Sequence, residues 1–224
     1  MRVSRAQAEE NHEAVVNAAS RLFREHGFDG IGLKDLMKGA GLTQGGFYKQ
    51  FASKEDLIAQ ASRRAMETAT RHWSDTIAAY PAAALEAVMA FYFSPEHRKE
   101  RGDGCPLVAL GGDAARQGPE VKAAFEAGLK AHLEVLDELA PSGEGEGPHG
   151  RAMTVLSLMV GAMMLSRTVN DEAFSRGFLE AAAHEVRRIA KTPRRSRRGA
   201  PPVTQAVRRA PDREQSHKGT TRRF

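Results

Sequence analysis

Residues 32–51 constrain the fold of this chain more than any other stretch, because they predict two short helices joined by a tight turn. The first helix has an apolar face with the i, i+3, i+4, i+7 spacing, formed by Leu33, Leu36, Met37 and Ala40. Gly41 follows this face, and glycine adopts a positive φ at a helix end at little cost. The pattern therefore favours a helix that stops at Gly41 and a chain that turns sharply there.

The second helix is predicted at about residues 44–50, with Thr43 as its N-cap. Phe47 and Phe51 fall on one side and are expected in the core. The opposite side carries Gln44, Gly45, Tyr48 and Lys49. Such a pair of helices fits a helix-turn-helix whose second helix enters the major groove of DNA, although an ordinary helical hairpin has the same pattern.

The flanking residues extend this unit on both sides. Upstream, an amphipathic helix ends at Gly27 and has an apolar face formed by Val15, Ala19, Leu22 and Phe23. Downstream, Ser53 is followed three residues later by Asp56, as in a capping box, and a long helix starts there. Three helices and the beginning of a fourth are therefore expected to form one compact N-terminal unit.

This region resembles the DNA-binding domain of the TetR/AcrR family. The sequence Ala40-Gly41-Leu42-Thr43 is followed at the family spacing by Gly45-x-x-Tyr48-x-x-Phe51-x-Ser53-Lys54-Glu55. The resemblance covers roughly the first quarter of the chain. It implies an all-helical, homodimeric transcription regulator, most often a repressor that is released from DNA by a small ligand.

The resemblance also implies the partners and the DNA contacts. Two copies of the second helix would bind a palindromic double-stranded DNA operator. The expected DNA-binding residues are Lys34, Thr43, Gln44, Gly45, Gly46, Tyr48, Lys49 and Lys54. Gln44 and Lys49 would contact bases, since Gln suits adenine and Lys suits guanine, and Lys54 would contact a phosphate. Tyr48 could equally be a half-buried packing residue.

Two positions depart from the family pattern. Gly32 stands where the family usually has a Ser or Thr that caps a helix and touches a phosphate. Gly46 replaces the commoner Thr, which removes a hydroxyl and is expected to loosen the second helix.

The remaining sequence also has helical spacing and no run typical of strands, so the predicted class is all-α with about nine helices. Further helices are expected at about 54–79, 82–93, 106–117, 119–140, 151–168 and 171–191, with a polar loop at 94–104. The helix at 151–168 is apolar on nearly all sides and is expected to be buried. The predicted domains are a DNA-binding domain at 1–56, an effector-binding and dimerisation domain at 57–191 and a basic tail at 192–224.

The resemblance implies that the last two helices pair with their copies in a second subunit, and that a cavity between the helices of the second domain holds a small-molecule effector. The aromatic and Met side chains proposed to line this cavity are Trp73, Phe91, Tyr92, Phe125, Met159 and Met163. Each of them could instead be an ordinary core residue.

Cys105 is the one cysteine of the chain and is predicted at the N-cap of a helix that begins with Pro106. A helix dipole stabilises a thiolate at such a position. The stretch Gly104-Cys105-Pro106-Leu107 resembles a TetR subgroup that includes sensors of electrophiles and oxidants. Cys105 is therefore a candidate sensor, although an N-cap cysteine without a basic partner is often inert.

The formal net charge of +5 comes from the C-terminal segment. Residues 191–224 hold 11 Lys and Arg against Asp212 and Glu214, which gives +9, so the preceding residues carry −4. The tail is expected to be disordered and either to add sequence-independent DNA affinity or to be a solvated extension. With no signal pattern at the N-terminus, no membrane span and a single cysteine, we expect a cytoplasmic protein.

No metal-ligand cluster, phosphate-binding glycine loop or pair of catalytic carboxylates is evident, so we expect neither a metal nor a cofactor, and not an enzyme. Two alternatives stay open. One is a non-specific DNA-coating protein that binds through its basic tail. The other is a thiol-dependent enzyme using Cys105, which would need a His and an acid beside it. His97 is expected in the charged loop, and the other histidines are scattered on helices.

Overall fold

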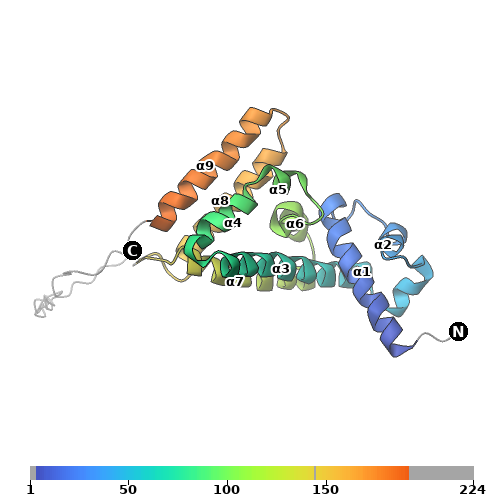
Figure 1. Ribbon diagram of the computed structural model, residues 1–224. Coiled ribbons are helices and arrows are strands. Elements are labelled where there is room, and N and C mark those ends of the chain that lie inside the picture. The colour runs from blue at the N-terminus through green and yellow to red at the C-terminus, as the bar shows by residue number, and fades with distance from the viewer. Residues whose placement is uncertain (1–3, 144, 192–224) are drawn as a thin grey trace, which may run out of the picture.

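The computed structural model describes residues 4–143 and 145–191, and the predicted basic tail at 192–224 lies outside the described residues. Within those ranges the chain is all-helical, as expected (Figure 1). The N-terminal elements are α1 (Arg5–His26), α2 (Leu33–Gly39), the 3₁₀ helix η1 (Gln44–Lys49) and the long helix α3 (Lys54–Ala79). The remaining elements are η2 (Pro81–Ala83), α4 (Ala84–Tyr92), α5 (Pro95–Lys99), α6 (Pro106–Ala114), α7 (Pro119–Leu139), α8 (Gly150–Arg167) and α9 (Glu172–Lys191).

The predicted helix ends of the N-terminal unit are confirmed. Gly27 and Gly41 both have positive φ, at 78° and 72°. The Ser53 hydroxyl accepts the Asp56 N–H at 3.1 Å, which caps α3. The reciprocal bond of the capping box is shifted by one residue, because the Asp56 carboxylate accepts the N–H of Ala52.

The predicted second helix of the helix-turn-helix forms as the tighter η1 rather than as an α-helix. Thr43 occupies the N-cap of η1, as predicted, but its hydroxyl makes no capping bond. Gly45 and Gly46 explain the difference, because glycine disfavours a regular α-helix and a short 3₁₀ turn requires fewer ordered residues.

The polar loop predicted at 94–104 contains a short helix, α5. Ser94 accepts the N–H of His97 and Pro95 occupies the first helical position, which are two standard signals for a helix start. The prediction of a loop was wrong, because this cap and Pro95 start a helical turn in spite of the charge of the segment.

Two hydrophobic cores lie along α3. The first joins α1, α2, η1 and the beginning of α3, and it continues onto α6 and α7 through Leu110, Val121 and Phe125. The second surrounds Trp73 and is formed with α4, α7, α8 and α9. The N-terminal unit is therefore packed directly against the second half of the molecule, and α3 and α7 lie side by side along the base of the view (Figure 1).

Helix α8 is not buried on all sides within one chain, which corrects that expectation. Met153, Met164 and Leu165 are exposed on α8, as is Phe174 on the neighbouring α9. Across residues 4–143 and 145–191, no helix combines the length and hydropathy that a bilayer crossing requires.

Candidate functional site

The outer surface of η1 presents polar side chains to solvent. Gln44 and Lys49 are exposed, and Tyr48 is 74% exposed. Phe47 lies beneath them with no exposed surface, and its ring meets the Tyr48 ring edge-on at 5.1 Å. The alternative in which Tyr48 is a half-buried packing residue is therefore wrong, whereas the core placement of Phe47 and Phe51 is confirmed.

The other residues predicted to contact DNA surround this surface. Lys34 on α2 is exposed, as are Thr43 and Gly45, while Gly46 is half-buried. Gly32 occupies the N-cap of α2 and forms no side-chain cap, as its lack of a hydroxyl requires. The turn between α2 and η1 therefore has a solvent-exposed outer face.

Lys54 has a different environment from the one expected. Its ammonium donates hydrogen bonds to the carbonyl oxygens of Phe28 at 2.6 Å and Ile31 at 3.0 Å. The side chain therefore fastens the α1–α2 loop to the start of α3. A phosphate contact by this ammonium would have to compete with those two carbonyls.

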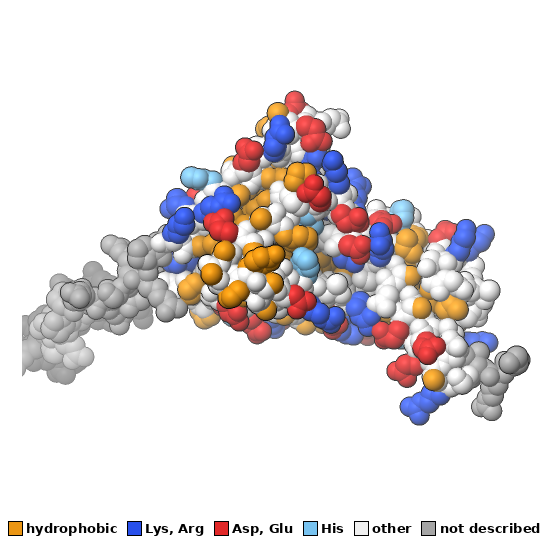
Figure 2. All heavy atoms as spheres, viewed as in Figure 1, with side chains coloured by type: hydrophobic (Ala, Val, Ile, Leu, Met, Phe, Trp, Pro, Cys, Tyr) orange, Lys and Arg blue, Asp and Glu red, His pale blue; other side chains and the backbone are white. Residues whose placement is uncertain are grey.

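A cavity of about 590 Å³ lies between α1, α3, α4, the α5–α6 segment and α7. Four predicted effector residues line it: Trp73, Phe91, Tyr92 and Cys105. Figure 2 shows hydrophobic side chains gathered around α4 in the middle of the molecule, with charged groups at the edges of this face. A cavity of this size, with largely apolar walls and a few polar groups, is typical of small-molecule sites.

Three of the predicted effector residues lie elsewhere. Phe125 packs in the first core, and Met159 and Met163 pack in the second. None of the three lines the cavity. Helical spacing correctly predicts that these side chains are buried. It does not distinguish a side chain beside a cavity from one within a filled core.

Three histidines line the cavity together: His72, His97 and His132. The sequence predicted His97 in a charged loop and the other two scattered on helices, so this meeting was missed. His97 is 5% exposed and His132 is completely buried. His132 lies on the same face of α7 as Leu129, Leu133 and Leu136, so the spacing of that helix was the available signal.

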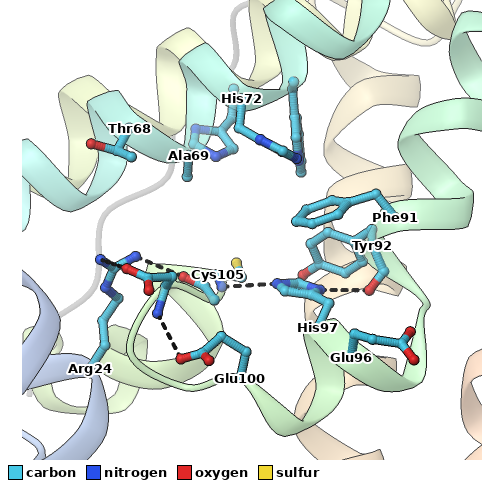
Figure 3. Close-up of a pocket in the computed structure, with 14 residues that line it drawn as sticks. Arg24, Thr68, Ala69, His72, Phe91, Tyr92, Glu96, His97, Glu100 and Cys105 are labelled. Carbon is cyan, nitrogen blue, oxygen red and sulfur yellow. Dashed lines mark hydrogen bonds and ion pairs between the residues drawn. The ribbon is translucent and has the colours of Figure 1, made fainter.

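His97 connects the end of α4 to Cys105 (Figure 3). Its Nδ1 lies 2.7 Å from the Tyr92 carbonyl oxygen, which can only accept, so Nδ1 carries the proton. Its Nε2 accepts the backbone N–H of Cys105 at 3.1 Å. Burial lowers the pKa of His97, and both bonds fit the neutral ring. Cys105 is the N-cap of α6, as predicted, and is 5% exposed.

Two arginines hold the segment that leads to Cys105. Arg24 on α1 is 7% exposed and donates to the Gly104 carbonyl at 3.0 Å. Arg167 on α8 donates to the carbonyls of Arg98 and His97 at 2.9 and 2.7 Å. Burial lowers the pKa of both guanidinium groups, and the charge of a Cys105 thiolate opposes that shift. The cations near the thiol therefore come from α1 and α8.

The residues described by the structure contain no cluster of three or more His, Cys, Asp and Glu side chains arranged to hold a metal.

The fold and the outer surface of η1 define a helix-turn-helix DNA-binding protein. Residues 15–61 match the family model described as bacterial regulatory proteins, tetR family. Residues 15–61 therefore form a DNA-binding domain of the TetR-family type.

Named relatives agree with this assignment. The chain is 26% identical over 167 residues to the HTH-type transcriptional regulator LmrA of Bacillus subtilis, which covers 72% of this chain and 89% of LmrA. It is 23% identical over 197 residues to the HTH-type transcriptional repressor NemR of Escherichia coli, covering 82% and 96% of the two chains.

Solved structures share the fold. The reduced form of E. coli NemR superposes with a TM-score of 0.66 at 22% identity, covering 82% of this chain and 98% of NemR. A TetR regulator from Chloroflexus aurantiacus superposes with a TM-score of 0.65 at 24% identity, covering 81% and 94% of the chains.

Proposed function

We propose that the protein is a homodimeric repressor that binds a palindromic operator and is released when a small molecule occupies the cavity or when Cys105 is modified. In this proposal residues 1–56 form the DNA-binding domain and residues 57–191 the effector and dimerisation domain. A relative named as a transcriptional repressor supports the direction of control.

DNA reading is assigned to the exposed face of η1. Gln44 and Lys49 would contact base edges in the major groove, and Tyr48 would lie against the sugar-phosphate backbone. The phosphate contacts are assigned to Lys34, Thr43, Gly45 and Gly46. Lys54 would make such a contact by giving up a bond to the carbonyl of Phe28 or Ile31. Two copies of η1 must be spaced by roughly 34–36 Å to read successive major-groove faces.

Dimerisation is assigned to α8 and α9. The exposed apolar side chains Met153, Met164, Leu165 and Phe174 lie on these two helices. Exposed apolar side chains of this kind favour association, because their burial removes hydrocarbon from water.

The observation that carries the proposal is the position of Arg24. This residue belongs to α1 of the DNA-binding domain, yet it lines the cavity and bonds to the residue before Cys105. A ligand or a thiol adduct that moved the Gly104–Cys105 segment would change a contact made by the DNA-binding domain itself. Such a differential contact is what coupling between two sites requires.

The test begins with genomic fragments retained by the purified full-length protein. Sequencing them should yield a palindrome, and fluorescence anisotropy should show tight binding to that palindrome and weak binding to a scrambled duplex of the same composition. Analytical ultracentrifugation should give a dimer. A stable monomer, or equal affinity for both duplexes, would overturn the proposal.

The DNA-coating alternative depends on the basic tail, which holds most of the excess positive charge. Removal of residues 192–224 should weaken binding to operator and scrambled duplex alike and reduce the salt dependence, while the preference for the operator persists. Loss of all preference in the shortened protein would favour the coating function.

The thiol-enzyme alternative has weaker support. Such an enzyme needs an imidazole that can take the proton of the thiol. The Nε2 lone pair of His97 instead accepts the backbone N–H of Cys105. It is therefore already used and does not face the thiol proton as a base. The relatives LmrA and NemR are named as transcriptional regulators.

A further inference from the structure

Two buried polar atoms on the cavity walls have no hydrogen-bond partner, the Tyr92 hydroxyl and the His132 Nε2. The Tyr92 side chain is 1% exposed and His132 is completely buried. A buried polar atom without a partner costs free energy, so native structures pair nearly all of them with protein, water or ligand. Two such atoms in one cavity indicate where a ligand would make its polar contacts.

The hydrogen bonds of His132 determine which kind of group it can receive. Its Nδ1 lies 3.0 Å from the Gly128 carbonyl oxygen, which can only accept, so Nδ1 carries the proton. The Thr70 hydroxyl lies 2.8 Å from the same nitrogen and donates its own proton to the Met66 carbonyl. Nε2 is therefore unprotonated and an acceptor. Burial lowers the pKa of His132, which keeps the ring neutral.

Nδ1 is directed toward Thr70 and Gly128, neither of which lines the cavity, so Nε2 lies on the other side of the ring, toward the cavity. The group that satisfies it must be a hydrogen-bond donor. An ether, a ketone or a carboxylate has no proton to give and cannot do so.

The Tyr92 hydroxyl provides the second polar position. Burial raises the pKa of Tyr92 well above its usual range, so the group stays protonated and can donate. Figure 3 shows this side chain directed toward Cys105. The Cys105 thiol lies close enough to contribute to the raised pKa of Tyr92, but no group lies at normal hydrogen-bond geometry from the hydroxyl.

The walls between these two atoms are aromatic. The Trp73 ring meets the His132 ring at 4.7 Å and the Tyr92 ring at 5.9 Å, both edge-on. Phe91 is part of the same wall and stacks on His97 at 5.0 Å. Planar aromatic molecules pack well between such rings.

The charges on the wall disfavour an anion. Glu96, Glu100 and Asp103 line the cavity. Arg24 is the only Arg or Lys among the lining residues, and it is engaged with Gly104 and Asp103. An anionic ligand would meet three carboxylates and one occupied guanidinium.

We propose that the cavity binds an uncharged aromatic molecule bearing a hydroxyl group, a phenol in chemical class. The ligand hydroxyl donates its proton to Nε2 of His132, its oxygen accepts the proton of the Tyr92 hydroxyl, and the ring packs against Trp73. Binding of a phenol in the cavity is independent of the proposed function. Only the role of that phenol as the effector rests on the proposed function.

The experiment compares three probes of one shape by isothermal titration calorimetry on the full-length protein without DNA. The probes are 4-phenylphenol, its methyl ether and the 4-phenylbenzoate anion. Trp73 is the single tryptophan of the chain, so its fluorescence reports occupancy of the same cavity. The phenol should bind at least 10-fold more tightly than the ether, and the benzoate should bind more weakly than the phenol.

The matched variants are His132→Asn and His132→Gln. The Asn amide can replace the donor at Nδ1 but has no atom at the Nε2 position, whereas the Gln amide reaches that position. In His132→Asn the preference for the phenol over the ether should fall to less than 3-fold, and His132→Gln should recover part of it. Tyr92→Phe should weaken phenol binding at least 3-fold.

Equal binding of phenol and ether to the parent protein would overturn the proposal, as would an unchanged preference in His132→Asn. Circular dichroism confirms that each variant is folded. Operator binding is measured separately: specific operator binding without any phenol binding would reject the ligand class alone. Phenol binding that leaves the operator complex intact would uphold the ligand class and reject its role as effector.

Discussion

The guanidinium of Arg24 donates a 3.0 Å hydrogen bond to the carbonyl oxygen of Gly104, although the two residues are 80 positions apart in the chain. Arg24 lies on α1, which packs against the helix-turn-helix, and Gly104 directly precedes the Cys105 thiol in the cavity wall. This bond joins the region proposed to bind the effector to α1 of the region proposed to bind DNA.

Replacement of Arg24 by Met should uncouple these regions, because Met keeps much of the aliphatic stem and removes every donor. We expect operator binding to persist and its release by the effector or by an alkylating agent to weaken at least 5-fold, within the usual range of coupling energies. Fluorescence anisotropy of labelled operator, with and without N-ethylmaleimide, measures how much operator each protein releases. Arg21→Met is the matched control, because Arg21 is exposed on the same helix and pairs with Asp103 but not with Gly104. Equal release of parent and Arg24→Met would contradict the role.

Lys49→Ala should reduce discrimination between operator and mismatched duplexes by ~1–3 kcal/mol if Lys49 contacts a base. The side chain is exposed on η1, so the substitution should leave folding stability unchanged. Anisotropy titrations on operators altered at single positions would locate the base. A uniform loss of affinity across all duplexes would make Lys49 a phosphate contact instead.

Cys105→Ser should still bind the operator in the presence of an alkylating electrophile, whereas the parent protein should be released. The exchange of sulfur for oxygen keeps nearly the same size at the N-cap of α6. Mass spectrometry of the intact protein should show one adduct on the parent and none on the variant. Release of both proteins at the same electrophile concentration would end the thiol-sensor proposal.

The stability of the folded protein should fall as the pH drops below about 6.5, the ordinary pKa of histidine. Burial lowers the pKa of both His97 and His132 in the folded chain, so the unfolded chain binds protons first. The contribution is complete above the unfolded pKa and is lost as the pH falls through the lowered folded values. Urea unfolding at pH 7.5 and pH 5.0 measures the slope. His132→Asn should flatten it, and the exposed His184→Asn should not.

Gly128→Ala should destabilise the protein, because a Cβ at this position would lie 2.5 Å from the Met66 Cβ where α7 packs against α3. Overpacking of this kind costs about 1–3 kcal/mol. Gly111→Ala on α6 is the control, since its Cβ would have no neighbour within 4 Å. The control should be neutral or stabilising by up to ~1 kcal/mol. Thermal unfolding that affects both variants equally would contradict the close approach of α3 and α7.

The N-terminal unit was predictable because local signals determine it. The positive φ of Gly27 and Gly41 and the cap formed by Ser53 depend on neighbouring residues, and the spacing of Leu36 and Met37 indicates their burial directly. η1 was only partly predictable, since the balance between a 3₁₀ turn and an α-helix depends on how Gly45 and Gly46 affect a very short segment.

The cavity could be predicted only in part because it forms where distant helices meet. Trp73 and Tyr92 were expected to line it and do so, whereas Met159 is a core residue with the same helical spacing. The meeting of His97 with Cys105 depends on the unpredicted helix α5. The approach of Arg24 depends on how α1 packs against α6, which no local pattern specifies.

Helix α3 runs without interruption from the Ser53 cap to Tyr80 and contains neither glycine nor proline, so it has no internal joint. Trp73 near one end and Lys54 at the other are separated by ~28 Å at 1.5 Å per residue. A rod of that length that tilts by about 5° around one end shifts the other by ~2.5 Å, close to half the pitch of a helical turn. A small change in the packing around Trp73 can therefore alter the distance between the two copies of η1 in the proposed dimer. That distance must match the fixed spacing of the major groove.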